Sequence, residues 1–283
     1  MDIKNVGVVG CGLMGRGIVE ISAKAGYNVI VSEVNQELLD KGMAALNSSM
    51  AKAVERGKST EAEKAAMMGR IKSTLKMDDF KNCDLIIEAA VENLELKKKI
   101  FAELDKICAK DAILATNTSC LSIIDIAAMT KRQDKVFGMH FFNPVPVMKL
   151  LELVKTIVTS EETMNVGKAF GKATGKTIVT SPDIPGFIVN RLLMPFLIEA
   201  VKLLESGQVT KEDIDKAITL GLNHPMGPLT LADFVGLDTA YFICSAIYDE
   251  FKDDRFASPI LLRKMVTAGQ YGRKSGKGFY DYK

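Results

Sequence analysis

A histidine and a glutamate, twelve residues apart, are the strongest candidates for proton-transfer chemistry in this chain. His140 is one of two histidines and directly follows the apolar run Val136–Met139, a predicted strand. Glu152 stands in the next apolar run, where a carboxylate costs free energy unless it is paired. Pairing the two would fix the imidazole tautomer and stabilise its protonated form, as general acid–base catalysis needs. Taken alone, His140 is better interpreted as a structural histidine, and the polar cluster around it favours the catalytic interpretation.

A glycine-rich turn near the N-terminus has the spacing of a dinucleotide-binding loop. It follows the predicted strand Asn5–Val9 and opens a predicted helix, which is the context that the G-x-G-x-x-G pattern requires. The three glycines allow a tight turn, a close backbone approach to a pyrophosphate, and close packing of the helix on the strand. The loop residues predicted to contact this cofactor are Gly10, Gly12, Leu13, Met14 and Gly15.

An acidic residue ends the second predicted strand, Asn28–Ser32, about 20 residues further on. The carboxylate of Glu33 can accept hydrogen bonds from the adenosine ribose and would repel a 2′-phosphate, so the sequence predicts NAD rather than NADP. The alternative interpretation is that Glu33 is a solvated loop acid.

Polar residues follow the predicted strand Ile113–Thr116, at the same sheet edge as His140. Ser119 is a candidate substrate ligand. Alternatively, Asn117 and Ser119 cap a helix that begins near Leu121, and the residues alone favour this second interpretation.

Short apolar runs alternate with helical patterns up to about Ser181, which predicts an α/β fold with a Rossmann-type doubly wound parallel sheet. A helical hairpin is expected as an insertion at about 36–71, from helices at Leu38–Gly57 and Thr60–Ile71. We expect an NAD-binding domain over 1–184 and a smaller all-helical domain over 185–283. The predicted strands are Asn5–Val9, Asn28–Ser32, Asp84–Ala89, Ile113–Thr116, Val136–Met139, Leu150–Val158 and Thr177–Thr180. The helices predicted after the boundary are Phe187–Ser206, Lys211–Gly221, Leu229–Val235, Leu237–Phe251 and Pro259–Ala268.

The composition is that of an ordinary folded protein, with 47% hydrophobic and 25% charged residues and a formal net charge of +2. This balance gives no global reason to bind nucleic acid or a membrane surface. Five scattered cysteines lack zinc spacing and predict reduced thiols, so no metal is expected. A strand pattern begins almost at once after Met1, without room for a signal peptide, and we therefore expect a cytoplasmic protein.

Seven separated segments together resemble the 3-hydroxyacyl-CoA dehydrogenase family, over essentially the whole chain. They are the glycine turn, Glu88–Asn93, Ala115–Ser119, His140–Glu152, Pro185–Arg191, His224–Pro228 and Gly272–Tyr280. The resemblance implies an oxidoreductase that interconverts a 3-hydroxyacyl-CoA and a 3-ketoacyl-CoA with NAD. Within the family, the resemblance is strongest to bacterial enzymes that act on 3-hydroxybutyryl-CoA and acetoacetyl-CoA, as in butyrate and butanol fermentation.

The same resemblance implies roles for individual residues. His140 and Glu152 would form the catalytic pair, and Ser119, Asn143 and Asn190 would arrange the substrate, which replaces capping as the preferred role of Ser119. The further residues implied at the cofactor are Glu92, Lys97, Asn117, Ser119 and Asn143, with a solvated helix start as the alternative for Glu92 and Lys97. A structural or interface role is implied for His224.

Coenzyme A would meet the helical hairpin, where Ser49, Lys52, Arg56 and Lys58 offer groups suited to phosphates. A solvated basic helix face is the alternative for these residues. The helical domain is expected to form a homodimer. Three rival functions are a dehydrogenase of free hydroxy acids or sugar acids, a catalytically silent NAD-binding protein, and part of a multifunctional β-oxidation protein. The last is disfavoured because no further domain follows before Lys283.

Overall fold

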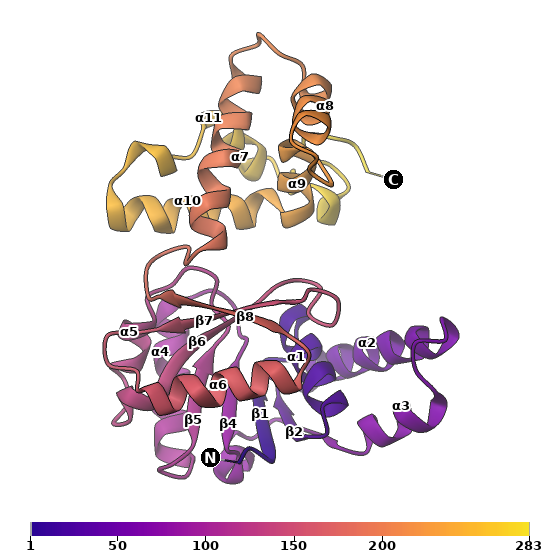
Figure 1. The fold of residues 1–283 in the computed structure, drawn as a ribbon, viewed down its shortest axis with the longest axis vertical. Helices are drawn as coiled ribbons and strands as arrows, with labels where there is room; N and C mark the ends of the chain where they lie inside the picture. The colour runs from indigo at the N-terminus through magenta and orange to yellow at the C-terminus, as the bar shows by residue number, and fades with distance from the viewer. Residues whose placement is uncertain (1, 283) are drawn as a thin grey trace. The chain divides into compact units, whose positions relative to one another are not determined.

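The computed structural model describes residues 2–282, and a boundary between Ile184 and Pro185 divides the chain into two compact units. Within the described residues, the first unit contains an eight-stranded sheet and the second is built from helices joined by short turns (Figure 1).

The strand order in the sheet is β3-β2-β1-β4-β5-β6-β7-β8. The order reverses between β1 and β4, and this reversal is where doubly wound sheets bind ligands, beyond the carboxyl ends of their strands. The strands are β1 (Asn5–Val9), β2 (Asn28–Ser32), β3 (Ile71–Thr74), β4 (Leu85–Glu88), β5 (Ile113–Thr116), β6 (Val136–Phe141), β7 (Leu150–Lys155) and β8 (Thr177–Pro182). The predicted doubly wound sheet is confirmed.

One strand pair departs from the expected parallel arrangement. β7 runs antiparallel to β6, whereas the other neighbouring pairs in residues 2–282 are parallel. The segment 142–149 that joins β6 to β7 is too short for the crossover that a parallel neighbour needs.

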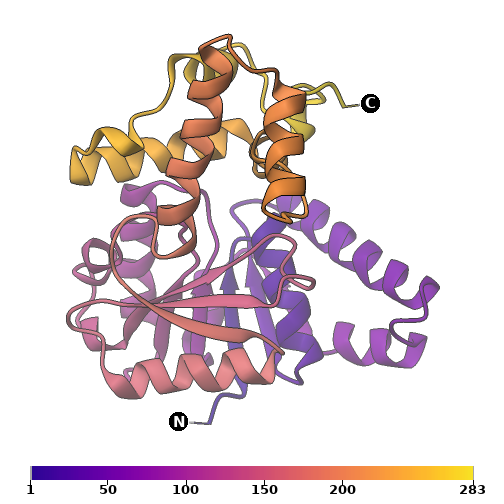
Figure 2. The same cartoon turned by 45° about the horizontal axis from the view of Figure 1, so that its top comes forward.

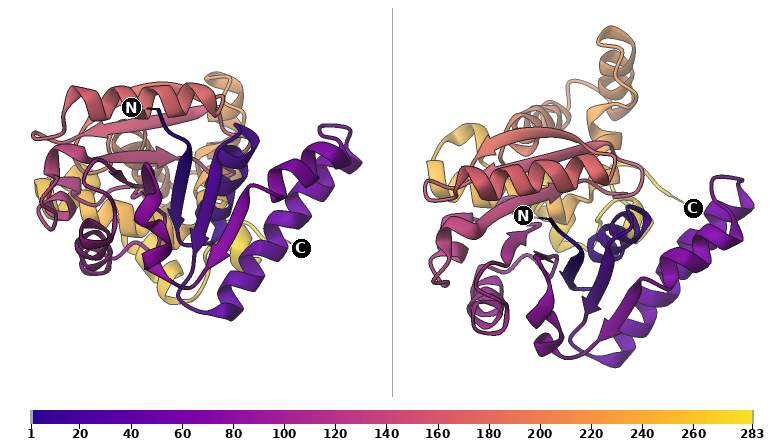
Figure 3. Two further views of the ribbon diagram at one scale, coloured as in Figure 1. Left: turned by 90° about the horizontal axis from the view of Figure 1, so that it is seen from below. Right: turned by 60° about the horizontal axis from the view of Figure 1, so that its bottom comes forward.

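Helices cover both faces of the sheet, as Figure 3 shows. Helices α1 (Leu13–Lys24) and α6 (Glu161–Ala173) pack in the main apolar cluster on one face, where the rings of Tyr27 and Phe170 stack with centroids 5.3 Å apart. Helices α4 (Leu94–Ile107) and α5 (Ile123–Ala127) pack on the opposite face. Successive strand residues point to opposite faces, which explains why these strands are apolar throughout.

Two helices follow β2 and extend beside each other (Figure 2): α2 (Gln36–Glu55) and α3 (Glu61–Met68). A capping box between Thr60 and Glu63 starts α3. The predicted helix Thr60–Ile71 was too long, because Gly69 ends α3 and Ile71 begins β3, an edge strand that was not predicted.

Four predicted strands need corrected ends: β4 covers Leu85–Glu88 rather than Asp84–Ala89, and β8 continues beyond Thr180 to Pro182. β6 continues beyond Met139 to Phe141, so His140 lies inside the strand rather than after it. β7 ends at Lys155 instead of Val158, because hydrogen bonds between Thr156 and Thr159 close a turn there.

The second unit is helical, as predicted, with small shifts at the helix ends. Its helices are α7 (Val189–Glu205), α8 (Lys211–Gly221), α9 (Pro228–Val235), α10 (Leu237–Phe251) and α11 (Ile260–Thr267). The buried carboxylate of Asp233 accepts hydrogen bonds from the backbone amides of Phe279 and Tyr280 and from the Tyr282 hydroxyl, and so fastens the C-terminal segment to α9. Over residues 2–282 no single helix is long and apolar enough to cross a membrane; α9 and α10 pass that test only together, bent by 94°.

Candidate active site

The sheet register brings the predicted proton-transfer pair together. His140 of β6 lies directly opposite Glu152 of β7 in the antiparallel ladder. His140 Nδ1 is 2.7 Å from Glu152 Oε2, and their side chains are 5% and 0% exposed. The expected contact is therefore present, in surroundings where an unpaired carboxylate would be costly. The Phe142 ring packs on the imidazole with a centroid distance of 4.5 Å.

The loop after β5 is hydrogen-bonded to β6, the strand that carries His140. Asn117 Oδ1 accepts a 2.9 Å hydrogen bond from the backbone amide of Phe141. Helix α5 begins at Ile123 with Ser122 as its N-cap, so the interpretation of Asn117 and Ser119 as helix caps was wrong. The chain first turns through Thr118, whose hydroxyl accepts from the Leu121 amide, and this turn delays the helix start.

A chain of buried charges connects β4 to the Ser119 backbone. Glu88, at the end of β4, accepts hydrogen bonds from Lys97 Nζ at 2.6 Å and from Thr116 Oγ1 at 2.7 Å. Lys97 Nζ is also 3.3 Å from Glu92 Oε2, and Glu92 Oε1 accepts from the Ser119 amide at 2.5 Å. Glu92, Lys97 and Ser119, which the resemblance implies at the cofactor, therefore belong to one network of contacts.

This network contradicts the alternative of a solvated helix start, since the Lys97 side chain is 1% exposed. Glu88 was not predicted as an individual site residue. The signal was available: Glu88 ends the apolar run Leu85–Ile87, and an acid in an otherwise apolar strand is the same feature that singled out Glu152.

The glycine turn has the shape of a phosphate cradle. Gly10 has a φ of +97°, and a Cβ atom on it would lie 2.7 Å from the Ala89 carbonyl oxygen. A Cβ on Gly15 would lie 1.9 Å from the Gly10 oxygen, whereas one on Gly12 would meet no atom within 4 Å. Gly12 caps α1 without a side-chain hydrogen bond, so the first amides of the helix can receive an anion. These features fit a dinucleotide.

Glu33 is tied to this turn. Its Oε2 accepts a 2.9 Å hydrogen bond from the Cys11 amide and its Oε1 accepts one of the same length from the Val34 amide. The half-buried carboxylate is thus fixed beside the glycine turn rather than solvated in a loop.

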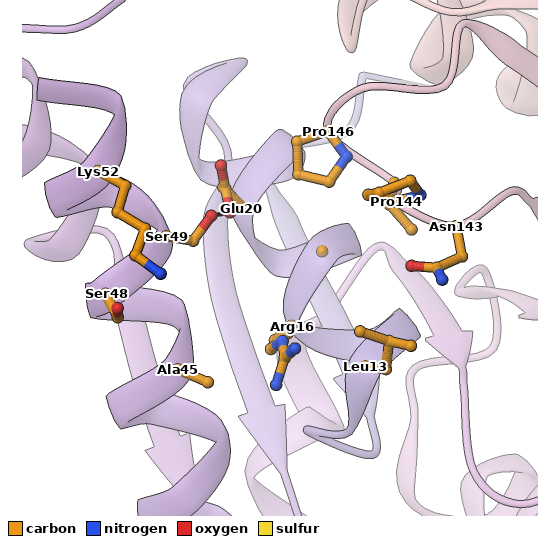
Figure 4. Close-up of a pocket in the computed structure, with 12 residues that line it drawn as sticks. Leu13, Arg16, Glu20, Ala45, Ser48, Ser49, Lys52, Asn143, Pro144 and Pro146 are labelled. Carbon is orange, nitrogen blue, oxygen red and sulfur yellow. Dashed lines mark hydrogen bonds between the residues drawn. The ribbon is translucent and has the colours of Figure 1, made fainter. Parts of the chain in front are cut away.

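A cavity of about 350 Å³ opens between α1, α2 and the segment 143–146 (Figure 4). Leu13 and Asn143, predicted at the cofactor and substrate, line the same cavity as Ser49 and Lys52, predicted at coenzyme A. Ser49 Oγ donates a 2.9 Å hydrogen bond to Glu20 Oε2. Burial raises the pKa of Glu20, partly offset by this hydrogen bond and by nearby Lys24 and Arg16.

Lys176 holds in place the segment that forms one wall of this cavity. Its buried ammonium donates hydrogen bonds to the carbonyl oxygens of Val145 and Met148, which hold the segment that follows Asn143. Burial lowers the pKa of Lys176. Sequence reasoning missed this residue because its partners lie about 30 positions away and are backbone atoms.

A second cavity of about 370 Å³ adjoins the first and is lined by several cations. Ser49 and Lys52 line both cavities, whereas Arg56 lines only the second of the two. The cationic residues of the second cavity are Lys24, Lys52, Arg56 and Lys58. All four side chains are exposed, as on a solvated face, and their positive charges suit an anionic ligand.

The five cysteines are free and buried. Burial, followed by the charge of Glu33, raises the pKa of Cys11 to about 11, and burial also raises the pKa of Cys120 beside Ser119. Neither is suited to act as a thiolate nucleophile near neutral pH. Among the residues that the structure describes, no three metal-ligating side chains gather in one place.

Two predicted residues lie in the second unit. Asn190 occupies the first turn of α7. His224 lies exposed in the turn between α8 and α9, where its ring packs edge-on against Phe196 with centroids 5.8 Å apart. The packing is consistent with the structural role expected for His224.

Two family models match consecutive parts of the chain. The NAD binding domain of 3-hydroxyacyl-CoA dehydrogenase matches residues 5–184, and the C-terminal domain of the same enzyme matches residues 186–282. The chain belongs to the 3-hydroxyacyl-CoA dehydrogenase family. It is thus an NAD-dependent oxidoreductase acting on 3-hydroxyacyl-CoA, which confirms the resemblance noted from the sequence.

Individual relatives cover nearly the whole chain. The 3-hydroxybutyryl-CoA dehydrogenase of Clostridioides difficile is 47% identical over 275 residues, 97% of this chain and 98% of that one. The crystal structure of (S)-3-hydroxybutyryl-CoA dehydrogenase PaaH1 from Ralstonia eutropha matches with a TM-score of 0.95 and 44% identity over 100% of both chains. The crystal structure of FadB2 from Mycobacterium tuberculosis matches with a TM-score of 0.98 and 46% identity, also over 100% of both.

The glycine turn supplies a matched pair of substitutions. Gly15→Ala forces a Cβ against the Gly10 oxygen, and we expect it to lower the free energy of unfolding by about 2–4 kcal/mol in the cofactor-free protein. Gly12→Ala meets open space and should leave that stability unchanged, yet weaken NADH binding at least about tenfold by occupying the pyrophosphate's place. Thermal unfolding and NADH fluorescence titration measure the two effects. Tight NADH binding by Gly12→Ala would contradict the placement of the pyrophosphate.

Proposed function

We propose that the chain interconverts (S)-3-hydroxybutyryl-CoA and acetoacetyl-CoA, with His140 as the general acid–base. The buried contact between His140 and Glu152 carries the mechanistic part of this proposal. The choice of substrate is supported by the 3-hydroxybutyryl-CoA dehydrogenases that match the chain over nearly its full length.

Bound NAD supplies the acceptor or donor of hydride at the substrate's third carbon. The protein moves the proton. With Nδ1 donating to Glu152, His140 takes up the hydroxyl proton at Nε2 in the oxidation and returns it to the oxygen in the reduction. Glu152 fixes this tautomer and stabilises the imidazolium while it exists.

Other predicted residues are proposed to position the ligands. Ser119, on the loop held by Glu92 and Asn117, would donate a hydrogen bond to the substrate's C3 oxygen, where negative charge grows during hydride addition. Asn143, which lines the first cavity, and Asn190 would orient the thioester end. Gly10, Gly12, Gly15 and Glu33 would hold the adenosine diphosphate part of NAD, leaving Glu92 and Lys97 near its nicotinamide half.

Coenzyme A is proposed to lie along the two adjoining cavities. Ser49 and Lys52 line both, so one extended ligand could contact them while its phosphates reach Arg56 and Lys58. Arginine and lysine form charge-assisted hydrogen bonds with phosphate oxygens.

The substrate and cofactor are tested together by following NADH oxidation at about 340 nm, the absorbance band of the reduced nicotinamide. We expect rapid turnover with acetoacetyl-CoA and NADH. Free acetoacetate should react far more slowly because it cannot use the cation-lined cavity, and NADPH should be a poor donor because Glu33 repels its 2′-phosphate. Equal turnover of acetoacetate would favour a free hydroxy acid dehydrogenase.

The role of His140 is tested by comparing the two histidines. We expect His140→Gln to lower kcat by about 10³-fold, because glutamine cannot exchange the proton, while changing the Kd of NADH less than about twofold. His224→Gln is the matched control, since this exposed histidine lies in the second unit's turn, and it should retain wild-type kcat. Steady-state kinetics and NADH titration give both values. A small loss in His140→Gln would rule out its proposed role.

We also propose that the chain forms a homodimer through its helical unit. Leu192, Leu220 and Leu222 of this unit are 72%, 77% and 59% exposed, and a second copy of the chain would remove such apolar surface from water. Light scattering after size-exclusion chromatography should give twice the chain mass, and Leu220→Lys should shift the distribution toward the monomer. A monomer at tens of micromolar protein would contradict this proposal.

A further inference from the structure

The charged network at the end of β4 contains two carboxylates and one ammonium group. We infer that Glu88, Lys97 and Glu92 together form a fixed negative charge that strengthens the binding of NAD⁺ relative to NADH. This inference rests on the proposed placement of the nicotinamide half beside Glu92 and Lys97.

The charge count follows from the contacts. Lys97 Nζ lies 2.6 Å from Glu88 Oε1 and 3.3 Å from Glu92 Oε2, so one positive charge is shared between two negative ones. The formal sum is −1. The side chains of Glu88 and Lys97 are 0% and 1% exposed, and the field of buried groups is screened less by water and salt than that of surface charges.

Neutral donors hold this charge in place. The backbone amide of Ala90 and the hydroxyl of Thr116 both donate to Glu88, at 2.7 Å each. The amide of Ser119 donates to Glu92. The carboxylates therefore cannot turn away when the charge of a bound ligand changes, as a surface side chain would.

The sheet topology places this network on the nicotinamide side of the cofactor site. Glu33, directly after β2, marks the adenosine side, and the glycine turn after β1 marks the pyrophosphate. A dinucleotide crossing the switch point continues toward the carboxyl ends of β4 and β5, where Glu88 and Ser119 lie. The glycine turn directly abuts this region, because a Cβ on Gly10 would be 2.7 Å from the Ala89 oxygen.

The oxidised and reduced cofactors differ in charge at the nicotinamide ring, which is positive in NAD⁺ and neutral in NADH. A fixed negative charge nearby attracts only the oxidised ring. On the enzyme, it favours transfer of hydride from NADH to the ketone carbon, with a proton added to the oxygen, over the reverse reaction. Glu88 and Lys97 then act on the reaction through charge, as positioning residues that do not touch the reacting atoms.

The test is the ratio of the Kd of NAD⁺ to the Kd of NADH, measured by calorimetry and fluorescence titration without substrate. Glu88→Gln keeps the side-chain shape and changes the network charge from −1 to 0, so we expect the ratio to rise about fivefold. The double variant Glu88→Gln/Lys97→Gln returns the charge to −1 through Glu92, and its ratio should return toward the wild-type value.

Controls separate charge from damage to the fold. Glu95→Gln removes an exposed carboxylate from α4, the helix that carries Lys97, and should leave the ratio of the two Kd values unchanged. Glu92→Gln makes the same change in network charge at a partly exposed position and provides a second route if Glu88→Gln folds poorly in a thermal unfolding scan. A structural role would weaken both cofactors together, and more so in the double variant.

An unchanged ratio in both single carboxylate variants, or a double variant that fails to recover, overturns the inference. Activity of the wild-type protein on acetoacetyl-CoA is measured separately. Failure of that assay would overturn the proposed substrate without altering the two cofactor affinities, so the two results remain distinguishable.

Discussion

Two carboxylates that are fully removed from water constrain the arrangement of the whole site. Glu88 and Glu152 each end or interrupt an apolar strand and have no exposed surface. A carboxylate in such surroundings is tolerated only with close donors, so each one fixes a specific partner. Glu152 fixes the imidazole of His140, and Glu88 fixes the ammonium of Lys97. The loop that carries Ser119 is held to β4 and β6 by hydrogen bonds of Asn117, and the segment that follows Asn143 is held by the Lys176 ammonium.

Much of this arrangement could be predicted because its causes are local in the sequence. The glycine turn, the first two apolar strands and the acid at Glu33 follow from backbone sterics, burial and spacing, and the structure contains them at the predicted positions. The pairing of His140 with Glu152 was also predictable, because a buried acid needs a donor and few candidates lie nearby. Which family the chain belongs to required the combination of seven separated segments.

The remainder depended on contacts between distant residues. Lys97 has an ordinary helical context, and its burial results from Glu88 nine positions earlier and from how α4 packs on the sheet. The antiparallel direction of β7 depends on the geometry of the segment before it rather than on strand composition. Ser119 looked like a helix cap because its residue type suits that role, but a turn at Thr118 moved the helix start to Ser122.

The antiparallel pairing of β6 with β7 limits which sequence changes the connecting segment 142–149 can tolerate. Because side chains alternate between the faces of a strand, shifting the β7 register by one residue would turn Glu152 to the opposite face and separate it from His140. An insertion or deletion of one residue that shifts the register of β7 would therefore separate Glu152 from His140. Substitutions in the connecting segment, such as at Pro144 or Pro146, would instead reshape the cavity wall without moving Glu152 away from His140.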